Sequence, residues 1–411
     1  MLFPEVPVTM RFASTAISIF LISARTTAFG LAKQPARGAS AFSSRRRSQH
    51  SIVQTLGSVL SQQCPSNIYN YRGGAMLSTS TASSAAVPTS TALNSAVTDE
   101  TQTAPTEIFR KDYQPLPFTV ATVNMDFNIQ DSKTVVTTEL TLMTNPAAAN
   151  VESKELVLDG DETCVKLLSL SMDGKDLTEG IDYTLAPGKL TILKPAAGSV
   201  ISTKVELIPQ ENTQLSGLYK SGPMYCTQCE AMGFRRITYY PDRPDNMAVF
   251  ERVRIEANAK EYPVLLSNGN LLEEGEVDGG ERRYAIWSDP FPKPSYLFAA
   301  VAGNLGSIAD SYTTTSGRNV KLQLYSEFAN VDKLAYAMDS LKRSMKWDED
   351  RFNLEYDLGV YNIVAVDSFN MGAMENKGLN VFNTAYVLAD EKTATDVDFE
   401  RVEGVIGELT F

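Results

Sequence analysis

The sequence predicts a mixed fold, in which an all-β sandwich or saddle-like domain precedes the opening part of an α/β domain. Two observations predict it. From Phe118 to about residue 300, apolar residues recur at every second position in short runs, without a convincing helical stripe. After Gly303, apolar residues begin to recur at helical spacing. We therefore predict a β domain at 107–302 and an incomplete second domain at 303–411.

Residues 1–106 are predicted to form a targeting leader and a disordered linker. The apolar run 12–24 suits a signal-peptide core and is shorter than the roughly 20 residues that span a bilayer. An arginine- and serine-rich stretch follows, with no acid between Glu5 and Asp99. Such a bipartite leader favours a plastid. A mitochondrial presequence is the alternative, or a cytoplasmic location if the gene start is wrong.

The strands of the β domain are predicted from period-two alternation. The clearest run is 135–142, where Val136, Leu140 and Leu142 lie on one face. Asp-Gly pairs at 159–160 and 173–174 indicate turns. Further short strands are predicted at Glu155–Leu158, Val165–Met172, Leu190–Leu193 and Lys204–Leu207, and around Val253 and Ile255.

The second domain begins with a predicted strand at 320–324 and continues with a helix that ends near Trp347. The stripe of that helix is Leu334, Met338, Leu341 and Met345. A buried strand at Ile363–Val366 follows. Thr395 and Asp396 are expected to cap a last helix. We expect the stripe of the last helix to lie exposed, because nothing follows to cover it; its members are Phe399, Val402 and Ile406.

Charge and cysteine content restrict the possible partners. The net charge is −12, and residues 99–411 alone carry 29 basic against 48 acidic side chains. Nucleic acid is therefore not expected as a partner. No transmembrane segment is predicted in the body of the chain, which we expect to be a monomer. Cys226 and Cys229 form a C-x-x-C without a second pair, and this favours two packed, reduced thiols over a zinc or redox site.

Two segments carry the chemistry. Residues 370–376 read Asn-Met-Gly-Ala-Met-Glu-Asn, and residues 226–231 read Cys-Thr-Gln-Cys-Glu-Ala. Together with Met-Lys-Trp-Asp-Glu at 345–349, they resemble the zinc-dependent aminopeptidase N family, in its bacterial and plant-type alanyl branch. The resemblance extends from about residue 107 to Gly407. It implies a thermolysin-like second domain and removal of amino-terminal residues from peptides with broad specificity.

The resemblance also implies which residues recognise a free amino terminus. Glu375 would bind the α-ammonium, assisted by Glu230, because a carboxylate in a confined pocket makes a charge-assisted hydrogen bond to it. Gln228 would supply an amide. Taken singly, Glu375 and Glu230 are also typical of solvated surface acids.

The remaining members of the implied site shape it. Gly372 and Ala373 would offer backbone groups to an extended peptide, which needs small side chains to approach. Met371 would form an adaptable wall for the first side chain, and Asn376 completes the substrate-binding set. A tight turn alone would also explain Gly372.

Zinc is expected for the full-length family enzyme, which holds it with an H-E-x-x-H motif. In the family that motif directly follows a Val-Ile-Gly like 405–407, whereas this sequence continues with Glu408 and its single histidine is His50. We therefore expect a truncation, from a gene-model error or a real isoform. With no catalytic residue and no metal ligand, the chain as written is predicted to be inactive. The alternative function is a non-catalytic peptide-binding or interaction module.

Overall fold

The computed structural model describes residues 109–149 and 154–410. The leader, and the localisation inferred from it, lie outside these residues and stay predictions. The boundary at residue 303 is likewise a prediction that is not tested. No described helix is long and apolar enough to cross a membrane.

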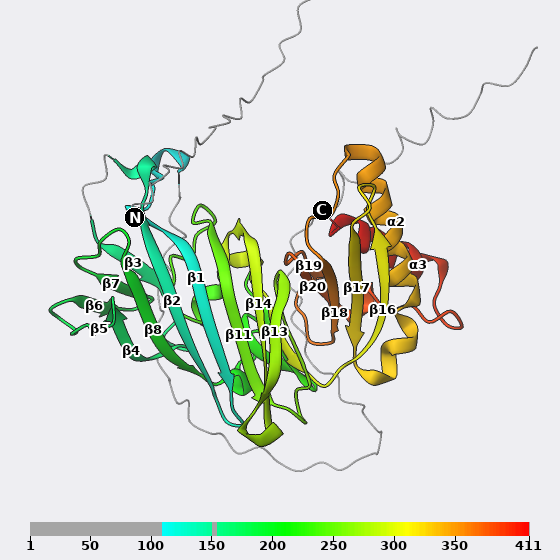
Figure 1. Cartoon of the computed structure of the whole chain (residues 1–411), viewed down its shortest axis with the longest axis horizontal. Coiled ribbons are helices and arrows are strands. Elements are labelled where there is room, and N and C mark those ends of the chain that lie inside the picture. Colours follow the sequence, from blue (N-terminus) through cyan, green and yellow to red (C-terminus); the bar gives the residue numbers. More distant parts are fainter. Residues whose placement is uncertain (1–108, 150–153, 411) are drawn as a thin grey trace, which may run out of the picture. The chain divides into compact units, whose positions relative to one another are not determined.

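An eight-stranded sheet forms the centre of the β domain (Figure 1). Only the pair β1 and β11 is parallel. Side chains of β1 and β2 alternate between buried and half-buried, as expected for a sheet with one face on the core. In sheet order the strands are β13 (Asn270–Val277), β14 (Arg282–Lys293), β11 (Ala248–Asn258), β1 (Phe118–Ile129), β2 (Thr134–Thr144), β8 (Val200–Leu207), β4 (Lys166–Met172) and β5 (Lys175–Asp176).

Two smaller sheets complete the β domain. The first contains β3 (Leu156–Asp159), β7 (Lys189–Ile192) and β6 (Tyr183–Ala186). The second, in the order β12-β15-β10-β9, contains β12 (Val264–Ser267), β15 (Ala300–Gly303), β10 (Met224–Gln228) and β9 (Gly217–Ser221). Between the sheets lies an aromatic cluster centred on Phe298, which stacks on Phe250 with 5.4 Å between ring centroids and meets Phe234 edge-on at 5.2 Å. Such pairs stabilise beyond their buried area.

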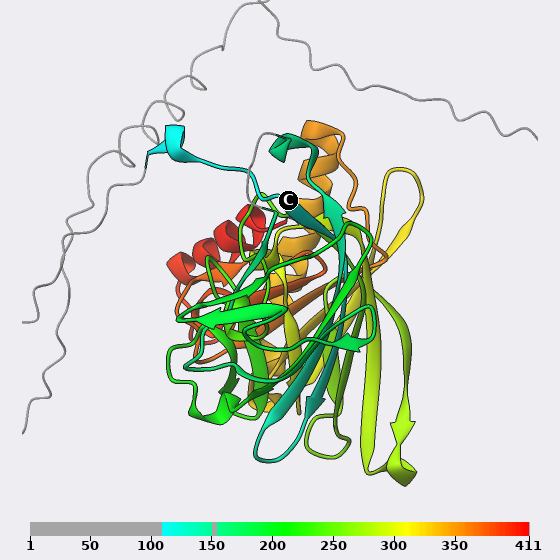
Figure 2. The same ribbon diagram turned by 90° about the vertical axis from the view of Figure 1, so that its left-hand side faces the viewer.

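A five-stranded sheet follows, in the order β16-β17-β18-β20-β19. Its strands are β16 (Gly306–Thr313), β17 (Asn319–Ser326), β18 (Val360–Val366), β20 (Leu379–Asn383) and β19 (Ala373–Met374). The helices α2 (Ala335–Phe352) and α3 (Asp396–Glu408) lie side by side on one face of it (Figures 1 and 2). Ile363 of β18 packs into the core shared with these helices, and Val364 packs into the core of the β domain. Both faces of β18 are therefore covered.

The predicted fold class is confirmed, with corrections to element ends. The strand predicted from Lys204 begins at Val200, because Ile201 and the buried Thr203 continue the core face. Helix α2 does not end near Trp347 but at Phe352. There Asn353 adopts a left-handed conformation, with φ of 56°, and terminates the helix.

The expectation of an exposed stripe on the last helix was wrong. Thr395 caps α3 in a capping box with Asp398, as predicted. However, Val402 is 0% and Ile406 is 1% exposed, because both pack into the core formed by the sheet and α2. The periodicity identified the buried face correctly, and the wrong step was to assume that no partner covers it.

Candidate amino-terminus-binding site

The Gly-Ala-Met-Glu-Asn segment lies in the connection between β18 and β20, at the edge of the five-stranded sheet. Ala373 and Met374 form β19, which pairs antiparallel with β20 through Phe382 and Val381. Because β19 is the last strand in the sheet order, its other edge pairs with no further strand in the described part of the chain. An open strand edge of this kind can take an extended peptide by main-chain hydrogen bonds.

Glu375 follows β19 and lines a cavity of about 500 Å³. Its walls combine aromatic and apolar side chains with several acids. They include Tyr296, Tyr356, Tyr361, Leu297, Met345, Leu354, Asp348, Glu355, Asp357, Lys377 and Thr410. The size and the mainly apolar character suit a small organic ligand that carries a positive charge.

Two acids of this cavity, Glu375 and Asp348, have no partner for their carboxylates among the described residues. Lys377 pairs with Asp357 at 2.7 Å, and Glu355 accepts hydrogen bonds from the backbone and hydroxyl of Ser316. Glu375 and Asp348 have no side-chain hydrogen bond or ion pair within the described residues. Asp348 is only 6% exposed, and burial raises the pKa of its carboxyl group.

The second predicted segment meets the first through Gln228, the last residue of β10. Gln228 is 1% exposed, and its Nε2 donates to the Sδ of Met371. The side-chain carbonyl oxygens of Gln228 and Asn376 are buried without a hydrogen-bond partner among the described residues. Buried polar atoms without a partner also occur elsewhere in the described residues, at Thr134 and Asn362 among others, so these two oxygens are free to bind a ligand but do not by themselves define a site.

The other predicted residues are placed as follows. Met371, Gly372 and Ala373 are half-buried. A methyl group added at Gly372 would make only an ordinary contact with Tyr386, at 3.7 Å. Glu230 is exposed, and it is not among the residues that line the cavity of Glu375. The structure thus brings Gln228 and Met371 together and leaves the pairing of Glu230 with Glu375 a prediction.

Asp348 was not among the residues predicted from the sequence, although a signal was present. It lies three positions after Met345 and seven after Leu341, so it occupies the apolar face of α2. An acid on a buried helical face is unusual enough to indicate a functional role.

The described residues do not fit a zinc ion. No group of three or more histidine, cysteine, aspartate or glutamate side chains between 109 and 410 could hold a metal, apart from the undescribed gap at 150–153. Cys226 and Cys229 are free and fully buried. Burial raises the pKa of Cys226 to about 12 and that of Cys229 well above its usual range, so neither is a ready thiolate.

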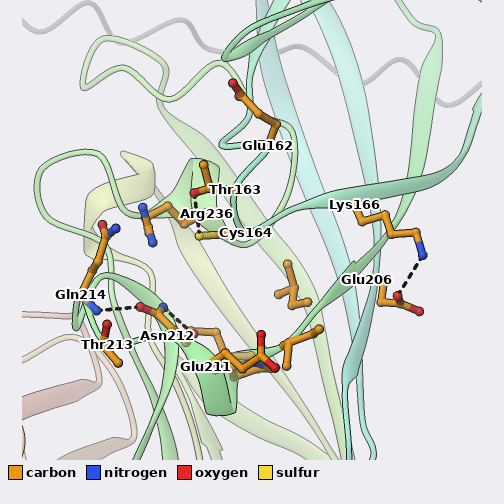
Figure 3. Close-up of a pocket in the computed structure, with 14 residues that line it drawn as sticks. Glu162, Thr163, Cys164, Lys166, Glu206, Glu211, Asn212, Thr213, Gln214 and Arg236 are labelled. Carbon is orange, nitrogen blue, oxygen red and sulfur yellow. Dashed lines mark hydrogen bonds and ion pairs between the residues drawn. The ribbon is translucent and has the colours of Figure 1, made fainter. Parts of the chain in front are cut away.

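A second cavity, of about 380 Å³, lies in the β domain (Figure 3). Glu206, Lys166 and Arg236 of its lining are paired, whereas the two lining acids without an ion pair among the described residues, Glu162 and Glu211, are exposed. Glu206 binds Lys133 at 2.8 Å and Lys166 at 3.2 Å, and Arg236 pairs with Asp161. Cys164, on its wall, accepts or donates a hydrogen bond with the neighbouring Thr163. None of the predicted site residues lines this cavity.

Comparison with known protein families identifies the class to which the chain belongs. Residues 112–297 match the model of the Peptidase M1 N-terminal domain, and residues 336–409 match that of the Peptidase family M1 domain. Fold and sequence together are those of the M1 peptidase family. The chain belongs to the M1 peptidase family, among its aminopeptidase N members.

Individual relatives agree with this assignment. The chain is 49% identical to aminopeptidase N of Caulobacter vibrioides over 300 residues, and 46% identical to that of Escherichia coli K12 over 303 residues. These matches cover 73% and 74% of the chain. A crystal structure of Legionella pneumophila aminopeptidase A in complex with aspartic acid matches 73% of the chain, with a TM-score of 0.67 and 37% identity. In all three cases the chain spans about a third (34%) of the relative's length.

Proposed function

We propose that this chain binds the free amino terminus of a peptide, with the carboxylate of Glu375 as the partner of the α-ammonium group. The observation that carries the proposal is that Glu375 has no ion pair or side-chain hydrogen bond among residues 109–149 and 154–410, in a cavity where Lys377, Asp357 and Glu355 all have partners. A charge-assisted hydrogen bond contributes about 1.5–3 kcal/mol, which a neutral, acetylated terminus cannot gain.

The open edge of β19 supports an extended ligand. A peptide placed along Ala373 would hydrogen-bond to the main chain, as in other cases of strand addition. Neither packing nor a positive φ requires glycine at 372. The missing side chain therefore leaves room for the backbone of a ligand, which suits the predicted role of Gly372. Gln228 and Met371 would form the adjoining wall.

Hydrolysis by this chain alone is not part of the proposal. Enzymes lower reaction barriers by at least about 8 kcal/mol, and a bound zinc ion supplies much of this in metallopeptidases by activating water. The 411 residues contain one histidine, His50, and the described residues contain no set of metal ligands. We propose that the chain as it stands recognises amino termini without cleaving them, while zinc-dependent cleavage belongs to the longer family enzyme.

The test measures binding of a short peptide and of its amino-terminally acetylated twin to the 411-residue chain by isothermal titration calorimetry. Glu375→Gln should weaken binding of the free peptide about 10- to 150-fold, the equivalent of one charged hydrogen bond. It should leave the affinity for the acetylated peptide unchanged. Glu355→Gln is the matched control, because this acid lines the same cavity but is already bound by Ser316.

Two outcomes would contradict the proposal. Equal affinity for both peptides in the wild type would favour the alternative of a non-catalytic interaction module that does not read amino termini. Turnover of an aminoacyl anilide in excess zinc, lost in Glu375→Gln, would show that the chain hydrolyses its ligand after all.

A further inference from the structure

The loop that carries Glu375 is held by the β domain as well as by its own sheet. We define this loop as residues 367–378, between β18 and β20. Within its own sheet, Ala373 and Met374 pair with β20, and Asn383 donates from Nδ2 to the carbonyl of Phe369 at 3.1 Å and from its backbone to the carbonyl of Gly372 at 3.0 Å. Thr384 and Asn362 donate hydrogen bonds to the first and the last residue of the loop. Further hydrogen bonds come from residues of the β domain, which precede the loop by about a hundred positions or more.

The beginning of the loop is fixed by strand β9. The hydroxyl of Tyr219 donates to the carbonyl of Ser368 at 2.9 Å, and the backbone N–H of Ser368 donates to Oγ of Ser221 at 3.1 Å. Tyr219 and Ser221 are 0% and 1% exposed. Both main-chain groups of Ser368 are thus satisfied by two buried side chains of one strand, which face the same way because they are two residues apart.

The end of the loop is fixed next to Glu375. Nδ2 of Asn268 donates to the carbonyl of Lys377 at 3.0 Å, while its Oδ1 accepts from the backbone of Ala299 at 2.8 Å. Gly378 has a φ of 79°, and a Cβ there would lie 2.8 Å from the backbone nitrogen of Gly269. The chain is therefore held against the β domain two and three residues after Glu375.

We propose that Tyr219, Ser221 and Asn268 are positioning residues, through which the β domain sets where the Glu375 carboxylate lies. The expected effect on peptide binding rests on the proposed function. The position of the loop is argued from these contacts alone. Buried partners that lock the orientation of a binding group are as important as the group itself, because a displacement of about 1 Å costs a large part of its contribution.

The decisive variant is Tyr219→Phe in the full 411-residue chain, which removes one hydroxyl and keeps the packed ring. We expect amide hydrogen exchange of residues 369–376 to rise at least fivefold, and affinity for the free peptide to fall about three- to tenfold. The affinity for the acetylated peptide should not change. Ser221→Ala provides a second, independent variant with the same expected pattern.

Tyr225→Phe is the matched control. Tyr225 is 1% exposed on the neighbouring strand β10, and its hydroxyl accepts a hydrogen bond from Gln210 at 2.7 Å; among the described residues it makes no hydrogen bond to the loop. A merely structural effect would appear equally in both tyrosine variants, as a lower melting temperature without a change confined to the loop.

The results separate the two proposals. Wild-type exchange and affinity in Tyr219→Phe and Ser221→Ala would overturn the positioning role. If the wild type does not prefer the free peptide, the proposed function fails, but loop exchange still decides whether the β domain holds the loop.

Discussion

The cavity that Glu375 lines and the cavity of the β domain differ in how their buried and half-buried acids are paired. In the cavity of the β domain, Glu206 lies between Lys133 and Lys166, which lower the pKa of its carboxyl group. In the cavity of Glu375, Asp348 pairs with no cation among the described residues, and burial raises the pKa of its carboxyl group. A paired acid is explained by the fold that it stabilises. A buried acid without a partner is a cost of folding, and it indicates that the missing charge comes from a ligand.

The most deeply buried ion pair in the described part of the chain joins Lys293 and Asp289, and it allows the effect of removing a cation from a buried acid to be measured. Nζ and Oδ2 are 3.1 Å apart, and the side chains are 3% and 0% exposed. Lys293 also lies over the ring of Phe250, 4.0 Å from its centroid. Lys293→Met should give the largest loss of stability, about 3–5 kcal/mol in urea unfolding, because it leaves a buried carboxylate unpaired. A loss below about 1 kcal/mol would contradict the view that a buried acid destabilises the fold when its cationic partner is removed.

The same lysine predicts a pH dependence. Burial lowers the pKa of Lys293 from 10.5 to about 8, although Asp289 opposes the shift. Between about pH 8 and 10.5 the unfolded chain then binds more protons than the folded chain, so the free energy of unfolding contributed by this group rises with pH. The stability difference between wild type and Lys293→Met should grow over pH 8–10. Tyrosine ionisation affects both proteins and cancels in the difference. A flat or falling difference would be inconsistent with a depressed pKa.

A smaller loss is expected in the β-domain cavity. The side chain of Arg236 is 10% exposed, pairs with Asp161 and donates from Nε to the carbonyl of Ser216 at 3.1 Å. Arg236→Met should cost about 2 kcal/mol, because Asp161 remains partly solvated, and should leave peptide affinity unchanged. Arg243→Met removes a more exposed pair with Asp245 and should cost less than about 1 kcal/mol. Weakened peptide binding in Arg236→Met would show that this cavity too serves the ligand.

Local patterns predicted much of the fold. The alternation at Val136 and Leu140 identified a strand with one buried face, and Thr395 with its neighbours identified the start of α3. These features depend on residues close in sequence. The burial of Val402 was missed because periodicity defines the apolar face of a helix but not its partner.

The sequence gives access to only part of the geometry of the candidate site, whose role in binding stays a prediction. The residues 370–376 do lie on one loop, with Glu375 in a cavity. The contact of Tyr219 with Ser368 joins positions 149 apart, and no local pattern encodes it. Asp348 was within reach of sequence reasoning, because its spacing from Met345 places it on the buried side of α2.

Asp348 gives the most direct test of a buried acid without a cationic partner. Above its raised pKa, the Asp348 carboxylate is ionised at a cost in the folded chain and at no cost in the unfolded chain. Asp348→Asn should therefore raise the free energy of unfolding at pH 7 by about 0.5–2 kcal/mol, the range typical of stabilising changes at functional sites. The gain should vanish as pH falls through the pKa of the folded state, because the acid is then neutral in wild type too.

The control for this variant is Asp350→Asn on the same helix, where the acid is 61% exposed and pairs with Lys346. It should change stability by no more than about 0.5 kcal/mol. If Asp348 is retained for a cationic ligand, Asp348→Asn should also bind the free peptide several-fold more weakly, so that stability and affinity move in opposite directions. A variant that gains stability and keeps full affinity would contradict the proposed difference between the two cavities. The unpaired acid would then destabilise the fold without contributing to ligand binding.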